Sequence, residues 1–212
     1  MRRTSKLVLA ALIVAVTIGC TSTKRVTVMI PPRVDLSQHE MIGVIEFDSS
    51  EEGELGPMAA RRFTDAARED QGLVRMVDFG SEKEALRSVG KSDLGTETFK
   101  ALGNKHGVRT IVVGELTISD IKPNLSIAGA LEGGSLTAKV DATLAVQMIE
   151  ASSGASIWSK SARATRSVGH ISVFKGGGVV FDAEDPEAAY GDLVDHLVAR
   201  VTHDFRVTYE RR

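Results

Sequence analysis

The chain has 212 residues, of which 42% are hydrophobic and 5% aromatic, which is enough for the core of about one ordinary domain. The chain has 26 lysines and arginines and 28 aspartates and glutamates. Removal of an amino-terminal leader with three basic residues would leave 23 basic and 28 acidic residues, so the mature chain would have a net charge near −5. This acidic balance argues against nucleic acid as a partner, because nucleic-acid-binding domains present a basic face.

The first twenty residues have the pattern of a secretory leader. Three basic residues lie within residues 1–6, an apolar run without charge covers residues 7–18, and Gly19 and Cys20 follow. A basic region, a short apolar region and a small residue before the cleavage point are typical of a signal peptide. Twelve helical residues cover only about 18 Å of a hydrocarbon core that is about 30 Å thick, so the run is too short to span a membrane.

Cys20 is the only cysteine of the chain, and it lies at the expected cleavage point. The stretch Thr17-Ile18-Gly19-Cys20 resembles the bacterial lipobox, in which the thiol takes a diacylglyceryl group and the freed amine is acylated. The resemblance implies lipidation of Cys20 and, because Thr21 follows in place of aspartate, sorting to the outer membrane. Several acyl chains give stable anchoring, and no thiol then remains for a disulfide or for catalysis. The alternative is an ordinary signal peptide with a coincidental cysteine.

Hydrophobic patterning predicts the elements that follow. We expect a signal peptide over residues 1–19, the lipidated cysteine and its tether over 20–36, and a single αβ domain over 37–212. Strands are predicted, in chain order, over residues 26–30, 40–47, 73–77, 108–118, 136–149 and 156–166. Helices are predicted from Pro57 to Gly72, from a capping box at Ser81 and Glu84 through Val89, over 96–106, and from Pro186 onward. Loops are predicted over 48–57, 123–135 and 167–185.

Two of these strands carry the clearest patterns. Residues 136–149 alternate apolar and polar side chains throughout, which is typical of a long, half-buried antiparallel strand. Residues 111–113 are apolar on both faces, which indicates a central strand covered from both sides. The fold class is therefore α/β or α+β, with a mixed β-sheet and helices packed on it, in the order β-α-β-α-α-β-β-β-α after an additional leading strand.

Sites for chemistry are weakly supported by the sequence. Residues 89–92 (Val-Gly-Lys-Ser) offer the end of a phosphate loop, but they follow a predicted helix instead of a strand. His196 and His203 are seven residues apart, about 10 Å along a helix, which is too far for a shared metal ion. Asp192 and His196 are four residues apart, a spacing that allows a shared metal ion, but such a pair on a helix is more commonly exposed to solvent without a metal. No nucleophile elbow is present. We therefore expect no enzyme activity, no catalytic residue, no metal and no cofactor.

A second Gly-rich segment is the most interesting part of the carboxyl-terminal half. Apolar residues flank a Gly-Gly-Gly tip at 176–178, which predicts a hairpin. If these side chains are exposed, they form a contact surface for a partner, and if the hairpin folds back, they are buried on its own sheet. The candidate contact residues are Ile171, Val173, Phe174, Val179, Val180 and Phe181.

Four segments together resemble a known family. Met41–Phe47 is similar to the hydrophobic strand, ending in Phe, that opens the CsgG-type lipoproteins. Leu73–Asp78, His106–Glu115 and Ile149–Trp158 are similar to three later segments of that family, in the same order. Relatives by fold include the amino-terminal domain of TolB and the LpoB-type activators of penicillin-binding proteins.

The resemblance implies a periplasmic, lipid-tethered, non-enzymatic domain that works through protein contacts in the cell envelope. In the curli-secretion members, two regions of each subunit assemble into an outer-membrane channel, and they would correspond to Lys122–Ser135 and Val168–Asp185. A membrane-crossing strand needs about 9 to 11 alternating residues, and both regions offer fewer.

The function that these observations favour is an outer-membrane-anchored periplasmic lipoprotein that binds another envelope protein or helps to assemble a complex. Its expected partners are the membrane, through the lipid, and an envelope protein, with a homo-oligomer left open and no nucleic acid. The alternative is a subunit of an oligomeric CsgG-like outer-membrane secretion channel, and an envelope hydrolase comes third.

Overall fold

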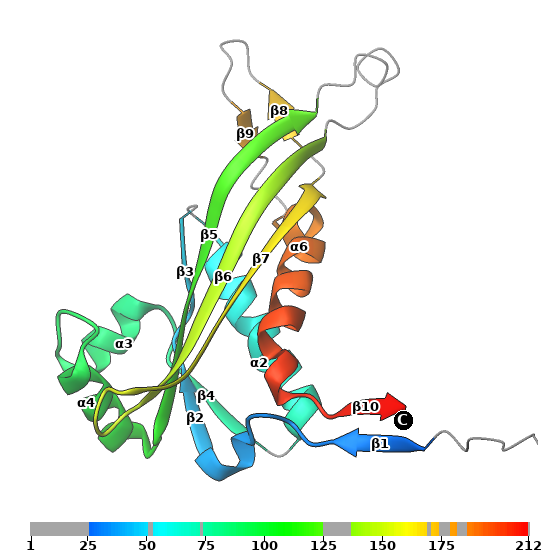
Figure 1. Ribbon diagram of the computed structural model, residues 1–212. Helices are drawn as coiled ribbons and strands as arrows, with labels where there is room; N and C mark the ends of the chain where they lie inside the picture. Colours follow the sequence, from blue (N-terminus) through cyan, green and yellow to red (C-terminus); the bar gives the residue numbers. More distant parts are fainter. Residues whose placement is uncertain are drawn as a thin grey trace, which may run out of the picture. The chain divides into compact units, whose positions relative to one another are not determined.

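The computed structural model describes residues 26–50, 53–72, 74–124, 137–168, 171–173, 179–181 and 186–211. The chain forms two compact units, one comprising Pro32–Arg206 and the other the two ends, up to Pro31 and from Val207. The elements are β1 (Thr27–Ile30), the 3-10 helix η1 (Leu36–His39), β2 (Met41–Val44), β3 (Asp48–Ser49), α2 (Leu55–Gln71), β4 (Arg75–Asp78), α3 (Glu82–Val89), α4 (Thr96–His106), β5 (Thr110–Asn124), β6 (Thr137–Glu150), β7 (Ser156–Val168), β8 (Ile171–Val173), β9 (Val179–Phe181), α6 (Pro186–Val201), the 3-10 helix η2 (Thr202–Phe205) and β10 (Thr208–Arg211) (Figure 1).

A mixed sheet forms the centre of the unit Pro32–Arg206. Its strand order is β4-β2-β5-β6-β7, with β3 paired beside β5. The strands β4, β2 and β5 run parallel, whereas β5, β6 and β7 are antiparallel neighbours. The predicted fold class and order of elements are confirmed, including the central position of residues 111–113 and the long antiparallel strand that follows.

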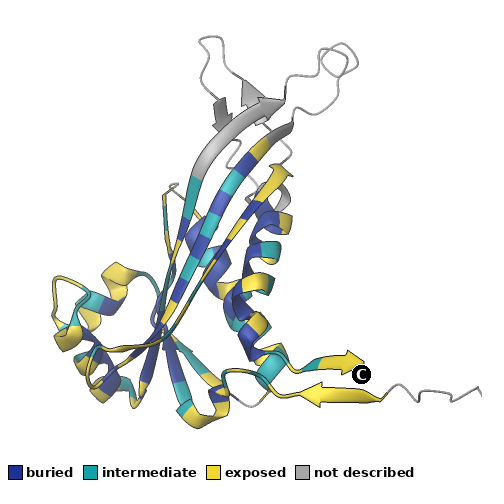
Figure 2. Ribbon diagram, in the orientation of Figure 1, coloured by how far each residue is buried: buried dark blue, intermediate teal, exposed yellow. Residues whose placement is uncertain are grey.

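The core lies on both faces of this sheet, because parallel strands need cover on each side. On one face α2 and α6 pack against β5, β6 and β7, with Phe63, Leu197 and Phe205 fully buried. On the other face α3 and α4 cover part of the sheet, and Phe99, Leu102 and Ile111 are among the buried residues of this second cluster. In Figure 2 the ribbon segments coloured as buried are concentrated in the sheet and in the helices α2 and α6 beside it.

Local signals set the helix ends. The predicted capping box of α3 is present, because Ser81 accepts from the Glu84 N–H and the Glu84 carboxylate accepts from the Ser81 N–H. The helix α4 has the predicted bounds and ends at Gly107, whose φ of 69° is in the left-handed region. The helix α2 begins two residues before Pro57, at Leu55, and ends before Gly72 as predicted.

Two predicted loops contain strand residues, for non-local reasons. The predicted loop after residue 47 contributes β3, because the edge of β5 beyond Val112 is free to pair with it in parallel. The strand β5 continues to Asn124, through Pro123, which the sequence had placed in a loop. Among the described residues, Pro123 pairs with Ala138 of β6 and with no second strand, and such an edge position tolerates a residue without an N–H.

The two ends of the unit Pro32–Arg206 are joined by hydrogen bonds. The Asp204 carbonyl accepts from the backbone N–H groups of Arg33 and Val34, at 2.9 and 3.1 Å. Gln71, the last residue of α2, donates to the carbonyls of Val34 and Phe205 at 2.9 and 2.6 Å. The chain therefore enters and leaves this unit at one place.

The other unit is a two-stranded antiparallel sheet in which β1 pairs with β10. Its amino-terminal strand was predicted from the alternation in residues 26–30, and its partner strand was not. Among the described residues, no helix is both long and apolar enough to cross a membrane.

Candidate functional site

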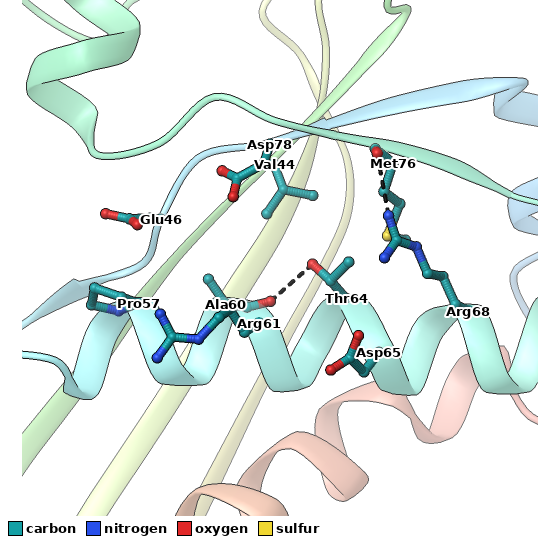
Figure 3. A pocket seen from close by; sticks show the side chains of 10 residues that line it. All are labelled: Val44, Glu46, Pro57, Ala60, Arg61, Thr64, Asp65, Arg68, Met76 and Asp78. Atoms are coloured by element: carbon teal, nitrogen blue, oxygen red, sulfur yellow. Dashed lines mark hydrogen bonds between the residues drawn. The ribbon is translucent and has the colours of Figure 1, made fainter. Parts of the chain in front are cut away.

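The carboxyl ends of the parallel strands β2 and β4 bring several charged side chains together. Glu46 follows β2, and Asp78 is the last residue of β4. With α2 they form a hollow of about 230 Å³, to which the helix contributes Arg61, Asp65 and Arg68 (Figure 3). Open αβ sheets bind ligands outside the carboxyl ends of their strands, so this is the strongest candidate site among the described residues.

A second hollow, of about 240 Å³, shares Glu46 with the first. It is lined by Ile45, which belongs to the core under α3 and α4, and by Val113, which packs against that core. Val44 and Ala60 of the first hollow belong to the core under α2. Glu46 is therefore the residue that the hollows on the two faces of the sheet have in common.

Glu46 and Glu84 have opposite pKa shifts with different causes. Partial burial raises the pKa of Glu46, and the negative charges of Asp78, Glu84 and Glu54 raise it further, against the smaller opposing effect of Arg61. The pKa of Glu84 is lowered by hydrogen bonds from the backbone and side chain of Ser81. Because the capping box accounts for the shift at Glu84, that shift is a property of a helix end and not a sign of acid–base catalysis.

The basic groups of the first hollow are partly engaged. Arg68 donates to the Met76 carbonyl at 3.3 Å. This carbonyl lies on the outer side of the edge strand β4, so Arg68 supplies the hydrogen bond that a further strand would otherwise supply. Arg61 lies 3.7 Å from Glu54, and both side chains are mostly exposed. Glu46 and Asp78 thus lie in a hollow that could receive a cationic side chain, but it is smaller than the roughly 300 Å³ at which small-molecule sites begin.

A larger hollow, of about 500 Å³, lies where the end of α4 meets the β6–β7 turn. Lys100, Arg109 and Glu150 are its charged residues, and Ser152 is its only hydroxyl-bearing one. None of the lining residues is His or Cys, so they contain no Ser–His or Cys–His pair for nucleophilic catalysis.

The structure accounts for the weaker motifs in structural terms. Gly90 of the phosphate-loop candidate is the left-handed C-cap of α3 and not part of a strand-to-helix loop. His196 contacts Arg166, at 3.1 Å between Nδ1 and a guanidinium nitrogen, and His203 lies in η2. Among the described residues, no group of three or more His, Cys, Asp or Glu side chains is placed to hold a metal ion.

The predicted contact residues are placed only in part. The strands β8 and β9 pair antiparallel, with Ile171 opposite Phe181 and Val173 opposite Val179, which is the predicted hairpin pairing. Phe174, the glycine tip and Cys20 lie outside the described residues, as do residues 125–136 and 182–185 of the two regions compared with the channel. The contact-surface hypothesis and the lipidation of Cys20 stay predictions.

Sequence reasoning missed a buried charged cluster at Asp204. Its carboxylate accepts from Lys160 Nζ at 3.1 and 3.2 Å and from Trp158 Nε1 at 3.4 Å. Burial raises the pKa of Asp204, but the hydrogen bonds and charge of Lys160, with the Trp158 hydrogen bond, outweigh it and hold the pKa below its ordinary value. The cluster ties β7 to η2, and no local sequence signal marks it.

Comparisons with known proteins found similarity in structure only. No protein-family model matches the sequence, and no curated protein matches it. Among solved structures, the PelC dodecamer from Paraburkholderia phytofirmans is similar with a TM-score of 0.43 and 14% identity, over 86% of this chain and 97% of that one. The LpoB C-terminal domain from Salmonella enterica is similar with a TM-score of 0.40 and 11% identity, over 63% and 95%. Lipoprotein GNA1162 from Neisseria meningitidis has a TM-score of 0.37 and 14% identity, over 60% and 83%.

These neighbours include an LpoB domain and a lipoprotein, and they give no support to the CsgG-type part of the expected resemblance. Their TM-scores are all below 0.5, so they carry no argument about the role of this chain.

Proposed function

We propose that this protein is an outer-membrane lipoprotein, facing the periplasm, whose αβ domain binds another cell-envelope protein or helps to assemble an envelope complex without catalysing a reaction. The observation that carries the proposal is the amino-terminal sequence, in which a leader over residues 1–19 ends at Cys20, the only cysteine of the chain.

The position of the core supports this reading. Among the described residues, every buried member of both core clusters lies between Leu36 and Phe205. Cleavage before Cys20 and acylation of its thiol would therefore remove none of these core residues. An anchor at residue 20 is compatible with a fully folded domain.

The hollow at the carboxyl ends of β2 and β4 supports a role in protein binding. Its small volume and its three acidic groups, Glu46, Asp65 and Asp78, suit one lysine or arginine side chain of a partner better than a metabolite. A side chain of that kind would also relieve the repulsion that raises the pKa of Glu46.

Lipidation is tested by comparing the wild-type protein with Cys20→Ser. We expect the wild type to enter the membrane fraction, with the mass of a cleaved and acylated chain, and Cys20→Ser to lose the lipid mass. Thr21→Asp serves as the matched control: it should keep the lipid and change only the membrane to which the protein is sorted. An unmodified thiol, or a full-length product in the cytosol, would refute the proposal.

Partner binding is tested by crosslinking intact envelopes and capturing the protein. If the β8–β9 hairpin is the contact surface, the Phe174→Ser/Phe181→Ser double variant should no longer capture the partner. If the hollow around Glu46 is the contact surface, Glu46→Lys should no longer capture it. Ile157→Ser changes an exposed apolar side chain on β7 and is the control that should capture normally. A detergent-extracted particle of many protomers would favour the channel subunit instead, and a monomer or dimer would count against it.

A further inference from the structure

The β1–β10 ribbon carries most of the exposed large hydrophobic side chains of the described chain. Seven such residues are exposed, and all but Ile157 lie in or next to the ribbon. They are Val26, Val28, Met29, Ile30, Val207 and Tyr209. Scattered apolar residues on a surface need no explanation, but six within two paired segments are a local concentration that calls for one.

The strand register assigns these side chains to two faces. Met29 is opposite Tyr209 and Thr27 is opposite Arg211, so these four residues share one face, which we call the Met29–Tyr209 face. Val28 and Ile30 lie on the other face, each 38% exposed. On the Met29–Tyr209 face the exposed fractions are 60% for Met29 and 69% for Tyr209, so this face is the more open one.

The chemistry of the open face suits the boundary between lipid headgroups and acyl chains. Methionine supplies a flexible apolar side chain, and tyrosine supplies an apolar ring with a polar end, which is why tyrosine gathers at membrane interfaces. Arg211, on the same face, can pair with a lipid phosphate while its aliphatic stem lies along the apolar surface.

The length of the tether decides which surface is within reach. Thr27 is seven positions after Cys20, so an extended chain of that length places the ribbon within about 24 Å of the lipidated residue. A bilayer is therefore always close to the ribbon, at a high effective concentration, whereas any protein partner must arrive by diffusion.

We propose that the Met29–Tyr209 face of the β1–β10 ribbon lies on the surface of a phospholipid bilayer and provides a second, non-covalent attachment beside the acyl anchor. This inference rests on the proposed function, because the lipid at Cys20 supplies the proximity. Apolar burial of Met29 and Tyr209 and the pairing of Arg211 with phosphate provide the attraction, which is strongest on anionic lipid.

The test uses the mature chain from residue 20 with Cys20→Ser, so that no acyl group contributes to binding. We expect it to float with vesicles of phosphatidylethanolamine and phosphatidylglycerol at 3:1 and to bind more weakly to pure phosphatidylcholine vesicles. Met29→Ser/Tyr209→Ser should lower the partition coefficient about tenfold. Ile157→Ser, which changes an exposed apolar residue outside the ribbon, should leave it unchanged.

A second measurement leaves most of the ribbon intact. Because Cys20 is the only cysteine, the Cys20→Ser chain with Met29→Cys has a single thiol for a polarity-sensitive fluorophore. Its emission should shift to the blue on addition of the vesicles, and the same label at Ile157→Cys should not respond.

Three results would overturn the inference: no vesicle binding by the parent chain, equal binding by the ribbon double variant, or a shift at position 29 that depends on protein concentration without vesicles. The last would assign the face to a second copy of the chain. These measurements use protein without the acyl group, so they can fail while mass analysis of the wild type shows an acylated Cys20. Failure of this inference is therefore distinguishable from failure of the proposed function.

Discussion

The buried carboxylate of Asp204 offers the sharpest test of the energetics of this fold. Asp204→Asn keeps the size of the side chain and removes its charge, whereas Asp204→Ala also removes the acceptor for Trp158 Nε1. The Asp204 side chain is 11% exposed and that of Lys160 is 34% exposed, so the aspartate is held out of water while the lysine can recover some hydration when the pair is broken.

The magnitude follows from these exposures. A hydrogen bond to a charged group contributes about 1.5–3 kcal/mol, and partial solvent screening at Lys160 reduces this, so Asp204→Asn should lower the free energy of unfolding by about 1.5 kcal/mol. Asp204→Ala also leaves the indole N–H of Trp158 without its acceptor and should lower it by about 3 kcal/mol.

The assay is urea unfolding, followed by the fluorescence of Trp158, the only tryptophan, and by circular dichroism as a second probe. The folded state holds the pKa of Asp204 below its ordinary value of 3.8, so its contribution is complete well above pH 3.8 and is lost as the pH falls through the folded-state pKa. The stability gap between the wild type and Asp204→Asn should therefore be constant from about pH 5 to 8 and close at lower pH.

The matched control is Asp195→Asn, which breaks a more exposed ion pair with Arg62 and should lower the free energy of unfolding by less than about 1 kcal/mol. Equal stability of Asp204→Asn and the wild type at pH 7, or a gap that persists unchanged at pH 3, would refute this reasoning.

Three further predictions concern the sheet and its helices. A Cβ at Gly43 would lie 2.3 Å from the Phe79 ring, so Gly43→Ala should lower the free energy of unfolding by about 1–3 kcal/mol, and Phe79→Leu should recover part of that loss in thermal unfolding. Ser81→Ala removes the N-cap of α3 and should cost about 1 kcal/mol in urea unfolding, with Ser81→Asp close to wild type. Partial burial, with the charge of Asp78, raises the pKa of Glu46, so the ionised carboxylate destabilises the folded state at pH 7. Glu46→Gln should therefore raise the melting temperature at pH 7 and lose this advantage near pH 4, as the wild-type carboxyl becomes protonated. A difference in melting temperature that stays constant over that range would contradict the assignment.

Elements with local signals were predictable from the sequence. The helix α4 was predicted with its observed bounds, and α3 with its capping box, because the residues that begin and end these helices lie within a few positions of them. Long alternation also identified β6, whose described part begins at Thr137. In each case the determining interactions connect residues that are near in sequence.

Features that depend on distant pairing were not predictable. The hollow around Glu46 and Asp78 exists because β2 and β4 run parallel, and the only sequence signal was an acidic residue at or just after each of two strands. The contact of Asp204 with Lys160 spans 44 residues, and no spacing rule connects them. Nothing in the last residues of the chain indicated that β10 would pair with β1.

The pairing of the two chain ends nevertheless has a physical reason in the body of the protein. The Asp204 carbonyl binds the N–H groups of Arg33 and Val34, and Gln71 binds the carbonyls of Val34 and Phe205. These bonds hold the incoming and outgoing chain together at a sequence separation of about 170 residues, so most of the entropy of closing that loop is already lost when the core forms. The short strands β1 and β10 can then pair at a small further cost in conformational entropy. Without that closure the pair would not be stable, because an isolated two-stranded ribbon is only marginally stable in water.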